Sequence, residues 1–334
     1  MSHRFIKLIF FIALCFSAFS YTFAQSALPV VLDTIAVGGS GGMDYITCDP
    51  KTHRLYISHG TCVEVVQYDT KERFGSIEKT PGVHGIALAP EFSRGFTSNG
   101  KDGSVRVFDT KTLTTIKTID TKQKKPDALL YEPQTKRVFA FNGDSENCTA
   151  IDAETMEIVG TLALGGGPEA PVADRKGDIF VNIETTNEVV RFNAASLKIS
   201  SRWPIAPAQT PTGISMDRAN RILFIGGRNQ VLVAINADDG KIITSFPIGK
   251  GVDGTAFDSK TGMIYVSNKD GSLDVIHEES PLKFASVGKL QTSSGAKTLA
   301  LDNKSHRVYL PCARQVDGTG GMKGEMMVLV VGTR

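Results

Sequence analysis

The sequence predicts an all-β protein folded as a seven-bladed β-propeller with four antiparallel strands in each blade. Three observations predict this fold. A repeat of about 40 residues runs through the chain, each repeat contains four short runs of alternating apolar residues, and the number of runs closes a ring. Helical periodicity occurs only in the N-terminal segment.

The second run of each repeat gives the clearest signal. It is apolar and ends in small or polar residues, as in residues 55–59 (LYISH) and 264–268 (IYVSN). Seven such runs occur, and their successive starts are 40, 43, 41, 44, 41 and 44 residues apart. A period of this length is typical of a propeller blade.

The other three runs surround this one. A run with a Gly- or Pro-containing approach precedes it, as in GVHGIALAP at residues 82–90. An alternating run that ends in a polar turn follows, as in VRVFDT, and a fourth run comes next, as in TTIKTID. Each repeat therefore supplies the four strands of one blade.

The count of runs also predicts how the ring closes. Seven copies of the first three runs occur, but only six internal copies of the fourth. Residues 30–37 (VVLDTIAV) precede the first blade and are expected to complete the C-terminal blade beside EMMVLVV. This pairing leaves no open sheet edge, whereas an open solenoid would leave both ends unpaired.

Residues 1–24 resemble a secretory signal peptide that is cleaved. Arg4 and Lys7 form a basic start, residues 8–20 are apolar, and Thr22 to Ala24 place small residues at the cleavage positions. The alternative is a retained N-terminal anchor. We expect residues 25–334 to form one propeller domain that is exported, periplasmic or secreted, and no later stretch is long enough to span a membrane.

Charge and cysteine content narrow the classes of partner. Removal of Arg4 and Lys7 from the 37 basic side chains leaves as many basic as acidic side chains, which argues against a nucleic-acid partner. The cysteines form no C-x-x-C pair, so no zinc-ribbon or thioredoxin-type motif is present. Cys62 and Cys312 fall in loops of neighbouring blades, and a disulfide between them stays open.

The repeat resembles a known family. Residues 264–276 (IYVSNKDGSLDVI) resemble the YVTN β-propeller repeat, with Ser267 in the threonine place. Residues 25–334 as a whole resemble exported YncE-like proteins of that family, although Ile183, Gly227 and Cys312 depart from its preferred asparagine. The resemblance implies the propeller and a binding or scaffolding role, and propellers host many unrelated activities.

One polar position precedes the innermost strand of every blade. In a propeller these positions ring one mouth of the central channel, and they hold Asp44, His84, Asp127, Glu169, Thr212, Asp253 and Lys297. Like charges at this spacing raise carboxylate pKa values or attract a cation. No cofactor follows firmly, but a divalent metal (Ca, Mg or Zn) has these candidate ligands: Asp44, His84, Asp127 and Glu169. The alternative is that each side chain caps its own loop.

Loops on the same face supply further candidates. His59 stands where other blades have asparagine, and it is a candidate partner of His84 in a metal or acid–base pair. The asparagines at 99, 142 and 268 are expected to be scaffold. Glu184, Arg228 and Arg314 lie in loops that depart from the repeat, and the longest of these, residues 311–325, could be a lid or a plain insertion.

Two functions remain open at this point. The first is a monomeric, non-catalytic binding or scaffolding protein that presents a small molecule or protein site at the channel mouth. The alternative is an enzyme similar to propeller lactonases or lyases, in which the channel-mouth acids and His84 act and Arg228 or Arg314 orients an anionic substrate. No G-x-S-x-G or H-E-x-x-H motif supports a specific reaction.

Overall fold

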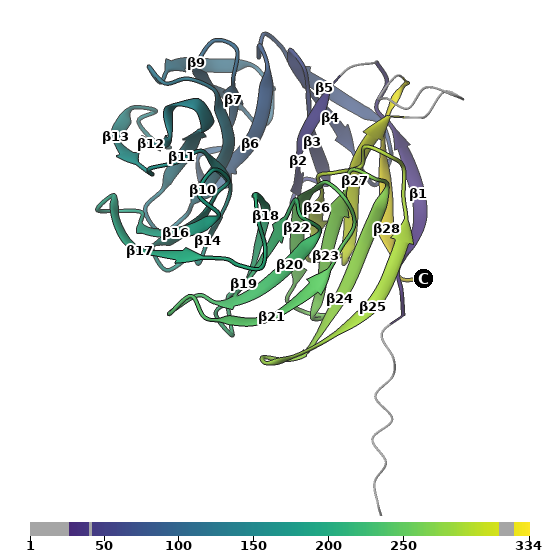
Figure 1. Ribbon diagram of the computed structural model, residues 1–334. Helices are drawn as coiled ribbons and strands as arrows, with labels where there is room; N and C mark the ends of the chain where they lie inside the picture. The colour runs from purple at the N-terminus through teal and green to yellow at the C-terminus, as the bar shows by residue number, and fades with distance from the viewer. Residues whose placement is uncertain (1–26, 40–41, 314–323) are drawn as a thin grey trace, which may run out of the picture.

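The computed structural model describes residues 27–39, 42–313 and 324–334. In these residues the chain forms seven four-stranded antiparallel sheets, and the innermost strands of successive sheets contact one another around a ring (Figure 1). The predicted all-β, seven-bladed propeller with four strands per blade is confirmed. The described part of the chain contains no helix with the length and hydrophobicity that a bilayer crossing requires.

The strands follow the chain in blade order. Blade 1 contains β2 (Met43–Asp49), β3 (Arg54–His59), β4 (Cys62–Gln67) and β5 (Arg73–Ile77); blade 2 contains β6 (Val83–Ala89), β7 (Arg94–Asn99), β8 (Ser104–Asp109) and β9 (Thr115–Asp120). Blade 3 contains β10 (Pro126–Glu132), β11 (Arg137–Asn142), β12 (Asn147–Asp152) and β13 (Ile158–Ala163); blade 4 contains β14 (Pro168–Ala173), β15 (Asp178–Ile183), β16 (Glu188–Asn193) and β17 (Lys198–Pro204).

The remaining three blades repeat this arrangement. Blade 5 contains β18 (Pro211–Asp217), β19 (Ile222–Gly227), β20 (Val231–Asn236) and β21 (Ile242–Pro247); blade 6 contains β22 (Val252–Asp258), β23 (Met263–Asn268), β24 (Ser272–Ser280) and β25 (Lys283–Gln291). Blade 7 contains β26 (Ala300–Asp302), β27 (Arg307–Ala313), β28 (Met326–Gly332) and β1 (Val30–Ala36). Two short 3₁₀ helices, η1 (Pro90–Phe92) and η2 (Gly143–Ser145), lie in turns.

Blade 7 is assembled from strands at opposite ends of the described chain. β1 pairs antiparallel with β28, so that Val30 lies opposite Gly332 and Ala36 lies opposite Met327. β1 therefore takes the outermost place in the sheet order β1–β28–β27–β26. The prediction that residues 30–37 complete the C-terminal blade is confirmed, with the strand ending at Ala36.

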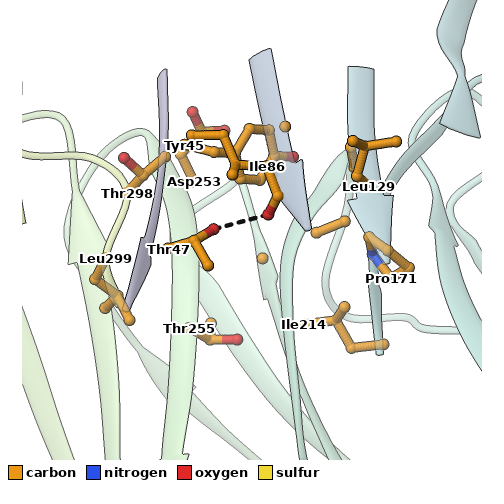
Figure 2. A pocket seen from close by; sticks show the side chains of 15 residues that line it. Tyr45, Thr47, Ile86, Leu129, Pro171, Ile214, Asp253, Thr255, Thr298 and Leu299 are labelled. Atoms are coloured by element: carbon orange, nitrogen blue, oxygen red, sulfur yellow. Dashed lines mark hydrogen bonds between the residues drawn. The ribbon is translucent and has the colours of Figure 1, made fainter. Parts of the chain in front are cut away.

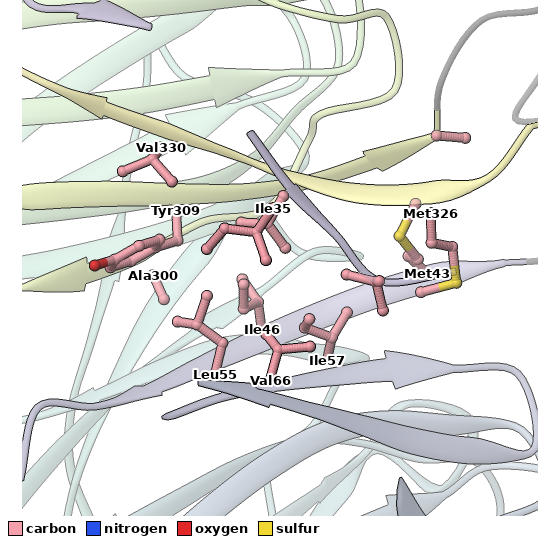
Figure 3. Packing of buried hydrophobic residues seen from close by; sticks show 13 residues of the cluster. Ile35, Met43, Ile46, Leu55, Ile57, Val66, Ala300, Tyr309, Met326 and Val330 are labelled. Atoms are coloured by element: carbon pink, nitrogen blue, oxygen red, sulfur yellow. The ribbon is translucent and has the colours of Figure 1, made fainter. Parts of the chain in front are cut away.

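The hydrophobic core lies between the blades rather than inside any one of them. At the closure, Ile35 of β1, Leu55 of β3 and Tyr309 of β27 belong to one buried cluster that joins blade 7 to blade 1 (Figure 3). The middle strands of each blade are covered on both faces, which is why runs such as β19 are buried throughout and do not alternate. Each blade thus depends on both neighbours for burial of its apolar surface.

The innermost strand of each of the first six blades begins with a β-bulge, at which the pairing register shifts. The pairing register shifts between Met43 and Ile46 in β2, for example, and between Val252 and Gly254 in β22. The same shift occurs near the start of β6, β10, β14 and β18. Such a bulge changes the direction of a side chain relative to a regular strand.

At some of these bulges, a serine hydroxyl on the adjacent strand forms hydrogen bonds with backbone groups that lack a partner in the sheet. Ser58 Oγ accepts a hydrogen bond from the Asp44 amide at 2.9 Å. In blade 6, Ser267 Oγ lies 3.3 Å from the Gly254 carbonyl at the bulge, and it also donates to the Lys297 carbonyl of the next blade at 2.6 Å. Because a bulge removes backbone groups from the ladder, a small hydroxyl at this place satisfies them. This explains the hydroxyl residue in runs such as LYISH and IYVSN.

The closure interface makes a direct stability prediction. Ile35→Ala should destabilise the protein by about 2–4 kcal/mol, because the buried side chain leaves a cavity between blades 7 and 1. Val31→Ala is the matched control, since Val31 lies on the same strand and is 37% exposed. Equilibrium urea unfolding measures both variants, and equal midpoints for them would contradict this account of the closure.

Candidate functional site

Charged side chains from every blade except blade 5 reach one channel mouth from the start of the innermost strand. Five lie in or beside the bulges, and the sixth precedes β26. Two loop residues join them, one after β15 and one after β19. We call this set the mouth ring: Asp44, His84, Asp127, Glu169, Glu184, Arg228, Asp253 and Lys297.

Ion pairs link four successive blades of the mouth ring. Lys297 of blade 7 lies between two aspartates: its Nζ is 3.1 Å from Asp44 Oδ1 of blade 1, and it also bonds Asp253 of blade 6. Asp44 Oδ2 in turn lies 2.7 Å from His84 Nδ1 of blade 2. Burial would lower the pKa of Lys297, but Asp253 and Asp44 outweigh it and raise that pKa.

The pair of Asp44 and His84 has a defined charge state. The hydrogen bond to Asp44 raises the pKa of His84 above its ordinary value, despite its burial. Burial alone would raise the pKa of Asp44, but the hydrogen bond from His84 and the charge of Lys297 lower it. The two shifts agree in favouring an imidazolium beside a carboxylate.

A second set of contacts continues the ring through blades 4 to 6. Arg228 of blade 5 lies 2.7 Å (Nη1–Oε1) from Glu184 of blade 4, and its Nη2 is 3.9 Å from Asp253 Oδ1 of blade 6. Arg228, predicted to face an anionic substrate, therefore already faces two carboxylates. Arg228 supplies the charged side chain of blade 5. Thr212, which holds the corresponding strand position, is uncharged and buried, and it donates a hydrogen bond to the Val252 carbonyl at 2.6 Å.

The alternation of charge fails between blades 3 and 4. Acids and bases alternate from Glu184 of blade 4 through blades 5, 6, 7, 1 and 2 to Asp127 of blade 3. The next residues in the ring, Glu169 and Glu184 of blade 4, are both acids. Burial, and then the charge of Asp127, raise the pKa of Glu169 far above its ordinary 4.5. Burial also raises the pKa of Asp127, which is 9% exposed. Two acids thus meet at this junction with no base between them, and their raised pKa values favour the protonated carboxyl groups.

Two cations approach Asp127 without reaching hydrogen-bond distance. His84 Nδ1 is 3.8 Å from Asp127 Oδ1, and Lys125 Nζ is 3.9 Å from Asp127 Oδ2. The Lys125 side chain is 46% exposed. Lys125 was not predicted as a site residue, although its position two residues before Asp127 is a signal that the sequence contained.

One group of donors in the mouth ring has the spacing of a metal site. Asp44, His84 and Asp127 each offer a donor atom, and these atoms lie within 4.8 Å of one another. Glu169, the fourth metal candidate, is not in this group, and it shares a hydrogen bond with Glu184 instead. A metal at this place would have to replace the Asp44–His84 hydrogen bond.

A cavity of about 190 Å³ lies in the channel beside the mouth ring (Figure 2). Asp253 and Tyr45 line it, together with apolar side chains such as Leu129 and Ile214. Burial, followed by the charges of Asp127 and Glu169, raises the pKa of Tyr45 well above its ordinary 10.0. Tyr45 was missed from sequence, where it reads as one alternating strand residue. The cavity has room for a small group of a ligand.

His59 lies in a different group from His84. Its Nδ1 is 3.9 Å from Cys62 Sγ and 3.9 Å from Glu64 Oε1, whereas His84 lies with the mouth ring. The structure thus assigns the two histidines to separate groups of possible metal ligands. The scaffold expectation for the asparagines agrees with their positions: Asn99, Asn142 and Asn268 are buried and bond within their own turns.

The disulfide left open by the sequence is not formed. Cys62 and Cys312 are both free thiols, as are Cys48 and Cys148. Cys62 instead contacts residues of its own hairpin, with Sγ 3.7 Å from Glu64 Oε1. Burial and then the charge of Glu64 raise the pKa of Cys62 to about 11. Arg314, the remaining loop candidate, lies outside the described residues.

Comparison with known proteins agrees with the fold. Architecture and mouth together define the chain as a seven-bladed β-propeller with a charged channel mouth. No family model and no curated protein sequence matches it. Among solved structures, a chain of Kuenenia stuttgartiensis hydrazine synthase is similar, with a TM-score of 0.72 and 16% identity over 81% of this chain and 93% of that chain. At this identity the likeness shows the shared fold alone.

The raised pKa of Glu169 predicts a specific pH dependence of stability. Because the folded protein holds the Glu169 proton above the ordinary pKa of 4.5, stability should fall as the pH rises past that value. Glu169→Gln should therefore raise the melting temperature at about pH 8 and change it little at about pH 4. Thermal unfolding at both pH values measures this, with the exposed Glu154→Gln as control. An equal effect of Glu169→Gln at both pH values would contradict the assignment.

Proposed function

We propose that this chain is an exported, YncE-like propeller that binds a small cationic molecule at the channel mouth without transforming it. The ligand would bring positive charge to the junction of blades 3 and 4, where Asp127 faces Glu169. An organic ammonium group is the ligand class that this place fits best. The repeat pattern IYVSN…LDVI and the N-terminal signal-like segment support the family and the location outside the cytoplasm.

The single observation that carries this proposal is the charge order of the mouth ring. Seven blades cannot carry strictly alternating charges, because an odd number forces two like charges to be neighbours. The ion pairs between blades join an acid to a base, as in Asp44 with Lys297 and Glu184 with Arg228. Between blades, the acid–acid neighbours are Asp127 and Glu169, and within blade 4 Glu169 also shares a hydrogen bond with Glu184. A bound cation would complete the compensation that the protein itself does not supply.

An ammonium group fits this junction better than a metal ion for two reasons. The channel cavity beside it is lined in part by apolar side chains such as Leu129 and Ile214, which suit the carbon skeleton of an amine. A divalent metal held by Asp44, His84 and Asp127 would have to break the 2.7 Å hydrogen bond between Asp44 and His84.

The alternative function is a metal-dependent enzyme of lactonase or lyase type. The grouping of Asp44, His84 and Asp127 donors within 4.8 Å favours it. In that case these residues would hold the ion, the ion would polarise a carbonyl or bound water, and Lys297 would remain in place to orient Asp44. Metal analysis and a lactone panel test this alternative directly.

Thermal shift assays with defined probes test the proposed binding. Tetramethylammonium and ethylammonium chlorides should raise the melting temperature relative to equal sodium chloride, and a probe at about 100 times its Kd would add about 2.7 kcal/mol of stability. Asp127→Asn should abolish the shift, because it removes the carboxylate that the cation contacts. The control Asp120→Asn removes an exposed acid on β9 and should retain the shift.

Two results would contradict the proposal. The first is an equal shift in the wild type and in Asp127→Asn, which would place the bound cation elsewhere. The second is a shift with Ca²⁺, Mg²⁺ or Zn²⁺ alone that is lost in His84→Gln and is accompanied by lactone hydrolysis. That second result would instead support the metal-dependent enzyme.

A further inference from the structure

A second cluster of metal-ligating side chains lies on the first hairpin, apart from the mouth ring. It contains His59 at the end of β3, Cys62 at the start of β4 and Glu64 two residues further along β4. We propose that His59, Cys62 and Glu64 form a zinc-binding site. Neither the resemblance nor the proposed ligand-binding function accounts for these three residues.

The hairpin brings the three donors together by its own geometry. His59 and Cys62 are cross-strand partners on either side of the turn at Gly60 and Thr61. Glu64 lies on the same face of β4 as Cys62, because side chains two residues apart in a strand point the same way. The site therefore needs no movement of distant segments to assemble.

The distances between the donors match those a zinc ion requires. Cys62 Sγ lies 3.9 Å from His59 Nδ1 and 3.7 Å from Glu64 Oε1, and His59 Nδ1 lies 3.9 Å from Glu64 Oε1. Zinc binds nitrogen, oxygen and sulfur donors at about 2.0–2.3 Å, so a tetrahedral ion separates them by roughly 3.3–3.7 Å. Each donor would have to move by only a few tenths of an ångström.

The neighbours of the cluster hold two of its ligands in position. Arg73 on β5 donates from Nε to Glu64 Oε2 at 2.9 Å, while Oε1 faces Cys62 and His59. Gly39 packs on the histidine ring so closely that a Cβ there would lie 2.8 Å from His59 Cε1. The His59 and Glu64 side chains are 14% and 12% exposed, so the donors are largely buried but still reach solvent.

The chemistry of the donors selects the metal. A thiolate and an imidazole favour zinc and other borderline or soft ions, whereas Ca²⁺ and Mg²⁺ prefer sets made of oxygen alone. The ion would replace the proton of the Cys62 thiol, as metal binding to cysteine generally does. The two carboxylates and single imidazole of the Asp44, His84 and Asp127 group lack sulfur, so spectroscopy can tell the two places apart.

Cobalt(II) and zinc titrations of the chelator-treated, full mature chain test the site. Cobalt should produce a sulfur-to-metal charge-transfer absorption at one equivalent, and zinc should displace it. Cys62→Ser should abolish that absorption and lower zinc affinity by more than tenfold, while Arg73→Gln should keep the absorption and weaken zinc by about 10–100-fold. The controls Glu72→Gln and Asp127→Asn should leave zinc binding unchanged.

A measurement on the unmodified protein covers the case in which Cys62→Ser fails to fold. Zinc should slow alkylation of Cys62 by iodoacetamide at least tenfold, with the modified residue located by mass spectrometry. The proposal is overturned if cobalt gives no charge-transfer absorption, if zinc leaves the alkylation rate unchanged, or if zinc binding is lost in Asp127→Asn and kept in Cys62→Ser. The last result would place the ion in the mouth ring.

Discussion

An odd number of blades is the constraint on which the electrostatics of this propeller depends. Six blades bring a charged side chain to a common mouth from the start of the innermost strand, and blade 5 brings Arg228 from a loop. In a ring of seven blades, positive and negative charges cannot alternate all the way round. Acids and bases alternate from Glu184 of blade 4 through blades 5, 6, 7 and 1 to His84 of blade 2. Asp127 of blade 3 then lies beside a second acid, Glu169. The raised pKa values there follow from topology as much as from the choice of residues.

The direction in which these side chains point depends in turn on the backbone. The bulge at the start of the innermost strands turns Asp44 and its counterparts toward the mouth, and the hydroxyl of Ser58 bonds the Asp44 amide. The same serine position in blade 6 reaches the neighbouring blade through the Lys297 carbonyl. A repeat motif that identifies the architecture thus also contributes hydrogen bonds that shape the mouth, while the turn asparagines such as Asn268 stay buried scaffold.

The sequence predicted the fold almost completely and the mouth only in outline. Strand runs, their spacing and the missing fourth run sufficed for seven blades and for the closure by residues 30–37, because these follow from local alternation and counting. The position of Asp127 was predictable, but its weak compensation was not, since it depends on distances to His84 and Lys125. A disulfide between Cys62 and Cys312 was left open from sequence, but the partner of Cys62 lies much nearer in the chain. In H-G-T-C, a two-residue turn makes His59 and Cys62 cross-strand partners.

The pairing of β1 with β28 also fixes an order of events in time. A ribosome makes β1 before any other described strand and β28 after all of them, so the edge of β1 has no partner during nearly the whole of synthesis. The contacts of Ile35 with Tyr309 and Val328 must wait equally long. Blade 7 is therefore the last blade that can form, and an unfinished chain carries an exposed strand edge that invites pairing with other chains.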